Sequence, residues 1–212
     1  MTTSLPARSV RKRNAIMSAG RQLFLTHGYR GTSVDQIAAA AEVSKQTVYK
    51  HFTDKRELLL AIVTEVLDGA VTPFLDQVSD LAQTSHLERD LARLAGSYLR
   101  SVLDESVVQL RRLVIGEANA LPELAEMYYQ RAPARTLRAF ADIFEVLDAR
   151  GLLRIVQPGL AARQFAFLVV GHAIDEALFY GGPRTLADLD VDEHVRAAIR
   201  TFFAAYRPIP EP

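Results

Sequence analysis

The sequence predicts an all-α protein with about nine helices. Apolar residues recur at spacings of three and four along most of the chain, and no segment shows the sustained apolar–polar alternation of a strand. Serine, aspartate and proline residues that favour helix starts precede many of these stretches. With 212 residues, 49% of them apolar, the chain is long enough for one large or two small domains with a well-packed core.

The first helix is expected to follow a mobile arm at residues 1–7. Basic residues gather at the start of this helix, where they oppose its dipole unless an anion such as a phosphate lies nearby. Gly28 is a suitable stop. The basic residues are Arg8, Arg11, Lys12 and Arg13, and the apolar face is Ile16, Ala19, Gly20, Leu23 and Phe24.

Residues 31–55 predict two short helices joined by a tight turn. Thr32 or Ser33 can cap the first helix, whose apolar residues follow a helical spacing. Ser44 can cap the second helix, at Lys45–His51. This pairing is typical of a helix-turn-helix, although a solvated helical corner explains the periodicity equally well.

The second short helix carries the groups that nucleic acids bind. Val48 and Phe52, four residues apart, point inward and leave basic, amide and hydroxyl groups on the outer face. In a DNA major groove, lysine can reach guanine acceptors and glutamine can pair with the adenine edge, so the lysine and glutamine side chains of this face suit base contacts.

The remaining helices are predicted from start signals and apolar stripes. Asp54 with Glu57 forms a capping box for a long helix from Lys55, whose first turn is a candidate phosphate site. This helix should bend or break at Pro73. Further starts are expected at Ser85 with Glu88, Ser106 with Gln109, Pro122 and Pro158, with a kink or division at Pro133, a stop at residues 181–183 and a last helix at Asp190–Tyr206.

Charge is distributed unevenly although the formal net charge is zero. Residues 1–56 hold ten Lys or Arg against three acids, and the remainder holds fifteen against twenty-two. Clustered positive charge favours polyanions because neutralised phosphates release counterions. The split indicates a polyanion-binding N-terminal unit on an acidic body; a basic surface without a partner is the alternative.

Composition disfavours several classes of site and location. The absence of cysteine excludes disulfides and thiolate metal sites and fits a reducing cytoplasm. The uncharged run at residues 164–174 is too short to span a bilayer, and no signal peptide is apparent. No nucleophile elbow, phosphate loop or zinc signature is present. We therefore expect a cytoplasmic, non-membrane protein without a cofactor; an all-α enzyme is a remote alternative.

The N-terminal block resembles the TetR/AcrR family of bacterial transcriptional regulators over about residues 9–60. The resemblance rests on Phe24, Gly28-Tyr29, Gly31-Thr32-Ser33, Ile37-Ala38, Val43-Ser44, Val48-Tyr49-Lys50-His51-Phe52, Lys55 and Leu58-Leu59, in that order. It implies a DNA-binding domain at 1–56 and a ligand-binding and dimerisation domain at 57–212. It also implies a homodimer, joined through its last two helices, that binds operator DNA and is released by a small-molecule effector.

The resemblance also implies roles for single residues. Lys45 and Gln46 fall at base-contacting positions. Glu42 departs from the family, which often has glycine in this turn; a non-glycine residue with positive φ costs about 1 kcal/mol, and its carboxylate can repel DNA. Glu42 is the only support for an alternative, a helical binding protein that no longer binds DNA. The phosphate-contacting positions are Ser33, Ser44, Thr47, Tyr49, His51 and Lys55.

Candidate effector-pocket residues lie on several body helices, although each also fits the core or a solvated surface. His172 and Glu176, four residues apart, can form half a metal site. A polar break in a dimer helix is the preferred interpretation, so no metal is predicted. The pocket candidates are Tyr98, Arg112, Glu117, Asn119, Tyr128, Phe144, Phe165 and His172.

Overall fold

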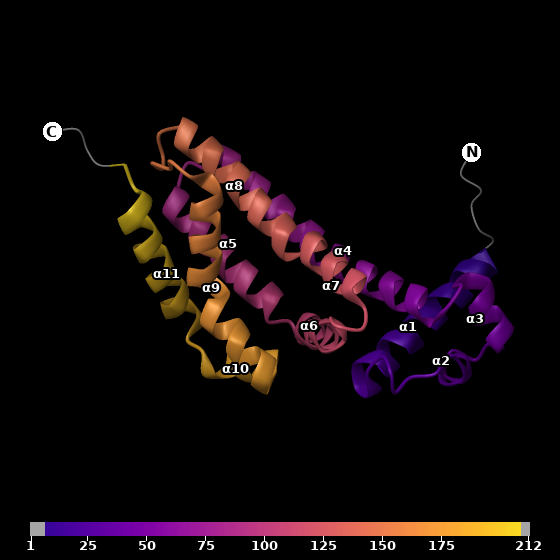
Figure 1. The fold of residues 1–212 in the computed structure, drawn as a ribbon. Helices are drawn as coiled ribbons and strands as arrows, with labels where there is room; N and C mark the ends of the chain where they lie inside the picture. Colours follow the sequence, from indigo (N-terminus) through magenta and orange to yellow (C-terminus); the bar gives the residue numbers. More distant parts are fainter. Residues whose placement is uncertain (1–6, 209–212) are drawn as a thin grey trace, which may run out of the picture. The chain divides into compact units, whose positions relative to one another are not determined.

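The computed structural model describes residues 7–208, and within that range it is all-α (Figure 1). The predicted fold class is confirmed. The helices beyond the expected nine are α8, divided from α7 at Pro133, and the short α10. The predicted arm lies outside the described residues, apart from Ala7. The elements are α1 (Ala7–His27), α2 (Val34–Ala40), α3 (Lys45–His51), α4 (Lys55–Asp80), the 3-10 helix η1 (Leu81–Gln83), α5 (Leu87–Val102), α6 (Glu105–Glu117), α7 (Pro122–Arg131), α8 (Pro133–Ala149), α9 (Pro158–Tyr180), α10 (Gly182–Asp188) and α11 (Val191–Tyr206).

Two predicted capping boxes are wrong, those at Ser85 and Ser106. Before α5, the hydroxyl of Thr84 donates to the Asp90 carboxylate at 2.6 Å. Before α6, the carboxylate of Asp104 accepts from the amide of Ser106 at 2.9 Å. In each case a side-chain oxygen one or two residues before the serine makes the hydrogen bond near the helix start. Residue spacing does not show which of two neighbouring polar side chains makes that bond.

The chain forms two compact units. The N-terminal unit contains the chain up to Val66 together with residues 110–126, and the C-terminal unit contains residues 67–109 and the chain from Met127 onward. The predicted domain boundary after residue 56 remains a prediction. The compact units do not follow a single cut in the chain, because residues 110–126 join the N-terminal helices.

The N-terminal unit is built around α1, α2, α3 and the first turns of α4. The apolar faces predicted from spacing are buried, including Ile16, Phe24 and Ile37. Gly20 lies where α1 meets α4: an added Cβ would be 3.0 Å from a methyl of Ile62. The close approach of these two helices therefore favours glycine at this position.

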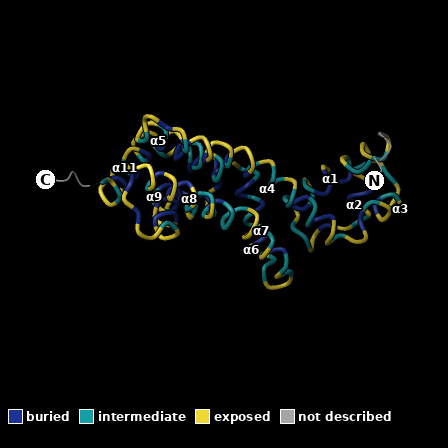
Figure 2. The backbone as a smooth tube through the Cα atoms, turned by 90° about the horizontal axis from the view of Figure 1, so that it is seen from above, coloured by how far each residue is buried: buried dark blue, intermediate teal, exposed yellow. Residues whose placement is uncertain are grey.

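The C-terminal unit packs α5, α8, α9 and α11 around an aromatic cluster. These helices lie side by side in both ribbon and tube views (Figures 1 and 2). Phe140 is fully buried at the centre, with its ring centroid 5.1 Å from that of Phe165 and 5.4 Å from that of Tyr98. The other rings of the cluster are Phe74, Phe144 and Phe202.

The predicted stop after α9 is followed at once by α10. Gly181 has φ +96°, a conformation that side chains disfavour. A Cβ on Gly182 would lie 1.8 Å from the backbone oxygen of Leu103, and the Gly182 amide donates to the Glu105 carboxylate at 3.1 Å. The two glycines thus turn the chain and lock α10 against the segment that starts α6.

An apolar face on α9 and α11 is left uncovered by residues 7–208. Phe167 of α9 is 73% exposed. A groove of about 480 Å3 lies beside it. The lining residues are Gln164, Phe167, Leu168, Thr201, Phe202, Ala205 and Tyr206.

The tight contact at Gly182 generates a stability prediction. Gly182→Ala should lower the free energy of unfolding by about 2 kcal/mol or more, because backbone must move to admit the methyl group. Gly69→Ala is the matched control in α4: nothing lies within 4 Å of its added Cβ, and alanine is favoured over glycine in helices by about 1 kcal/mol. Chemical denaturation at fixed protein concentration measures both; equal stability of Gly182→Ala and the parent chain would contradict the packing argument.

Candidate nucleic-acid interface

The outer face of α3 is the candidate site. This helix has only seven residues, too few for stability in water by itself. Val48 and Phe52, each 2% exposed, anchor it where it packs against α1 and α2. Lys45, Gln46 and Tyr49 are consequently exposed on the other side of α3.

Two serines fix the starts of α2 and α3. The Ser33 hydroxyl accepts from the Gln36 amide at 3.2 Å, and the Gln36 side chain accepts from the Ser33 amide at 2.7 Å, which forms a capping box. Ser44 accepts from the Thr47 amide at 3.2 Å, and the two hydroxyls lie 2.9 Å apart. Thr32 is not the cap, because it is buried and its hydroxyl donates to the backbone oxygens of Leu23 and Gly28.

Lys45 has a partner that the sequence analysis missed. Its ammonium lies 3.0 Å from both carboxylate oxygens of Asp35, a residue in the first turn of α2. The hydrogen bond with this carboxylate raises the pKa of Lys45. The two residues are ten positions apart, and only the turn between α2 and α3 brings them together.

Lys55 is also engaged within the unit. Its ammonium donates to the backbone oxygens of Tyr29 and Thr32, both at 2.8 Å, and lies 4.2 Å from the centroid of the Tyr29 ring. Two of its three N–H donors are therefore occupied by the loop between α1 and α2. The start of α4 at Lys55 is predicted correctly from the sequence, whereas these contacts, which span 23 and 26 residues, are not.

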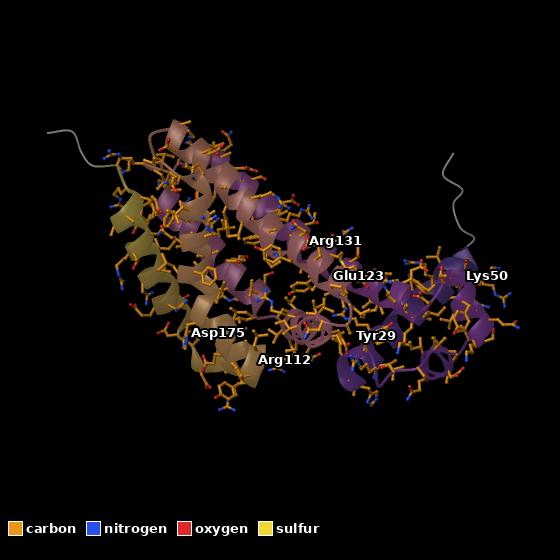
Figure 3. All side chains as sticks on the ribbon, in the orientation of Figure 1. Tyr29, Lys50, Arg112, Glu123, Arg131 and Asp175 are labelled. Atoms are coloured by element: carbon orange, nitrogen blue, oxygen red, sulfur yellow. The ribbon has the colours of Figure 1, made fainter. Side chains whose placement is uncertain are left out.

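The end of α3 carries a concentration of positive charge. The Lys50 side chain projects away from the unit (Figure 3). Partial burial lowers the pKa of His51, and the neighbouring charges of Lys50, Arg13 and Lys12 lower it further. The lowered pKa favours the neutral ring, which can donate one N–H to an anion. The negative charge of a bound anion would raise the pKa again.

Glu42 occupies the turn position where glycine is usual. Its φ of +53° makes it the single non-glycine residue with positive φ among residues 7–208. Its amide donates to the Ala39 oxygen at 3.1 Å and the Val43 amide donates to the Ala38 oxygen at 3.0 Å, which is the Schellman pattern of a helix C-terminus. The sequence-based expectation of positive φ is confirmed.

Residues 110–126 place two acids beside basic residues of the N-terminal unit. Arg30 lies 3.7 Å from Glu117, and Arg56 lies 2.6 Å from Glu123. Burial raises the pKa of the nearby Tyr29 phenol. The negative charge of Asp54 raises it further, as do the charges of these two glutamates. The positive surface is consequently weaker around Arg30 and Arg56 than the charge count for residues 1–56 implied.

The eight pocket candidates do not form one cluster within either unit. Arg112, Glu117 and Asn119 belong to the N-terminal unit, and the other five to the C-terminal unit. Phe144 and Phe165 are fully buried in the aromatic cluster, and their role toward an effector remains a prediction.

The remaining candidates include one that lies outside the core. His172 lies on the exposed side of α9, and its role toward an effector remains a prediction. Tyr98 is partly buried and Tyr128 is buried, and their role toward an effector remains a prediction. Among residues 7–208, no group of three His, Asp or Glu side chains is placed to hold a metal.

Comparison with known proteins yields matches over both parts of the chain. Residues 16–62 match the family described as bacterial regulatory proteins of the tetR family, and residues 89–208 match the C-terminal domain of AefR-like transcriptional repressors. A TetR-family regulator structure from Mesorhizobium loti is 33% identical, with a TM-score of 0.86, and the match covers 96% of this chain and 100% of the other. The flavonoid-responsive regulator FrrA is 28% identical, with a TM-score of 0.73 and coverage of 94% and 98%. The regulator RutR of Escherichia coli is 37% identical over 73 residues, and the match spans only 34% of each chain.

The strained turn between α2 and α3 generates a second prediction. Glu42→Gly should raise the free energy of unfolding by up to about 1 kcal/mol, because glycine adopts positive φ without steric cost. Glu42→Ala is the control: it removes the carboxylate but keeps a Cβ, so it should bring no comparable gain. Thermal unfolding of the three proteins separates the two effects, and an equal gain for alanine would assign it to charge instead of backbone strain.

Proposed function

The chain belongs to the TetR family of bacterial regulatory proteins, and from this premise we propose that it is a homodimeric repressor that binds a palindromic operator and releases it when a small-molecule effector binds. The family consists of transcriptional regulators and not of enzymes. The observation that carries the proposal is the outer face of α3: Val48 and Phe52 anchor the helix, and the side chains of its other face are exposed among the residues that the structure describes.

The outer face of α3 suits the major groove of DNA. The groove is about 12 Å wide and admits one helix, whose first turn approaches base edges. Lys45 and Gln46 are the first two residues of α3 and are exposed, which supports base contacts by both. Hydroxyl and ring N–H donors suited to phosphate oxygens surround these two residues. The donors belong to Ser33, Ser44, Thr47, Tyr49 and His51.

Lys55 is assigned a mainly positioning role within this proposal. Its two hydrogen bonds to Tyr29 and Thr32 hold the α1–α2 loop and leave one donor for a phosphate. Loss of Lys55 would therefore weaken DNA binding chiefly by loosening the start of α2.

The proposed dimer uses the uncovered face of α9 and α11. These are the helices predicted to dimerise, and α10 intervenes between them in sequence. A phenylalanine that is 73% exposed beside an apolar groove is costly in water and is typical of an interface. A two-fold axis through this face would give the dimer two α3 helices, which would bind two related half-sites in DNA.

Repression and effector release are proposed on the match to AefR-like transcriptional repressors over residues 89–208. An effector can weaken DNA binding only if it binds more tightly to a dimer in which the spacing of the two α3 helices does not fit the operator. The effector is proposed to bind in the C-terminal helices, with Tyr98 and Tyr128 as candidates for its contacts.

The proposed location is the cytoplasm, where DNA is accessible. Among residues 7–208, the segment Lys55–Gln83 is the one helix whose length and apolar content would allow it to cross a membrane. Core helices of soluble proteins have the same properties, and this segment contributes Leu58, Leu59, Ile62 and Phe74 to the interior.

Base and phosphate roles can be separated by measurement. Sites selected by the full-length protein from a random duplex library define its operator, and fluorescence anisotropy then gives affinities for single base-pair variants. Gln46→Ala should lose about 1–3 kcal/mol of discrimination at one base pair per half-site. Tyr49→Phe should weaken every variant about equally, by about 1 kcal/mol, because a phosphate contact carries no base information.

Two results would count against this division of roles. Identical profiles for the two variants across the operator set would contradict it. Failure of the parent protein to select any duplex would remove the DNA-binding proposal itself.

The proposed interface can be tested at Phe167. Phe167→Glu should convert the dimer to a monomer, because a charge would be buried against the partner. Binding to a duplex with two half-sites should then fall by about a hundredfold or more, since the second half-site no longer benefits from linkage. Val146→Glu, at an exposed apolar residue of α8, is the control and should leave both properties unchanged. Light scattering after size exclusion gives the mass; a dimeric Phe167→Glu protein would place the interface elsewhere.

A further inference from the structure

Asp35 and Lys45 form an ion pair on the surface proposed to meet DNA. The Lys45 ammonium lies 3.0 Å from each oxygen of the Asp35 carboxylate, and the side chains are 51% and 69% exposed, respectively. The pair joins the first turn of α2 to the first residue of α3. An exposed pair of this kind adds little to folding stability, so its consequence lies in what it presents to a ligand.

The pair presents donors and acceptors side by side. An ammonium has three N–H donors and a carboxylate has about four acceptor sites, so Lys45 and Asp35 each keep free capacity after binding one another. In the major groove, a G·C pair offers two adjacent acceptors, N7 and O6 of guanine, followed by a donor, N4 of cytosine. An A·T pair offers a donor between two acceptors. Only the G·C order gives Lys45 two neighbouring acceptors while it gives Asp35 a donor.

We propose that Asp35 and Lys45 together read one G·C base pair in each half-site. Lys45 donates to guanine, and Asp35 accepts from the cytosine amino group. This inference rests on the proposed DNA-binding function and deepens it, because it adds a base-reading residue on α2 to the residues on α3. Asp35 also restrains Lys45 from binding phosphates indiscriminately, because any phosphate must compete with the carboxylate already in place.

The test compares Asp35→Asn, Lys45→Gln and the control Glu42→Gln in the full-length dimer. Each is assayed by fluorescence anisotropy against duplexes in which every base pair of a selected half-site is varied in turn. Glu42→Gln removes an exposed acid from the same turn region without touching the pair, so it reports the general effect of losing negative charge near DNA. Circular dichroism confirms that the variants are folded.

The expected result is a loss of preference at a shared position. Asp35→Asn and Lys45→Gln should each reduce the preference for G·C at the same base pair by about fivefold or more. The double variant should lose little beyond the single ones, because the two side chains act as one reading unit. Glu42→Gln should change affinity for all duplexes alike and leave the preference intact.

Two outcomes overturn the inference while the proposed function stands. In one, Asp35→Asn strengthens binding to all sequences equally, as Glu42→Gln does, so that Asp35 acts only as a charge. In the other, Asp35→Asn and Lys45→Gln change preference at different base pairs. A parent protein that binds no duplex overturns the proposed function and this inference with it.

Discussion

The burial of Val48, on a seven-residue helix, and of Phe52, directly after it, is the constraint on which the candidate interface depends. Val48 and Phe52 are the apolar contacts that hold α3 in place, and the helix is too short to form without them. The packing of Val48 and Phe52 sets the orientation of α3 and therefore the direction of every polar side chain on its outer face. The serine caps at the starts of α2 and α3 then fix where each helix begins, so the interface is determined by packing on one side and capping on the other.

Much of this interface could be predicted from sequence because its determinants are local. Caps act over three residues and helical faces repeat over four, so Ser44, Val48 and the strained Glu42 were all identifiable. The pairing of Asp35 with Lys45 and the hydrogen bonds of Lys55 to Tyr29 could not be predicted, because they depend on how helices pack. Lys45 and Lys55, which were predicted to contact DNA, therefore also have partners within the unit.

The C-terminal helices were predicted less completely for the same physical reason. The all-α class and the proline starts of α7, α8 and α9 follow from local rules. The division between core and pocket does not, because an aromatic residue at helical spacing fits either. Phe144 and Phe165 fill the interior, and the short α10 follows a Gly-Gly turn whose close contact with Leu103 is visible only in three dimensions.

The clamp formed by Lys55 has a mechanical consequence. The residue that begins α4 is tied to two carbonyl groups of the α1–α2 loop, and α3 is packed on α1 and α2. A torque applied to the first turn of α4 would have to break these bonds before it could reshape the helix pair. The N-terminal helices would instead rotate as a rigid body. Such a rotation would keep the side chains of α3 in the same arrangement and would change only the position of that helix.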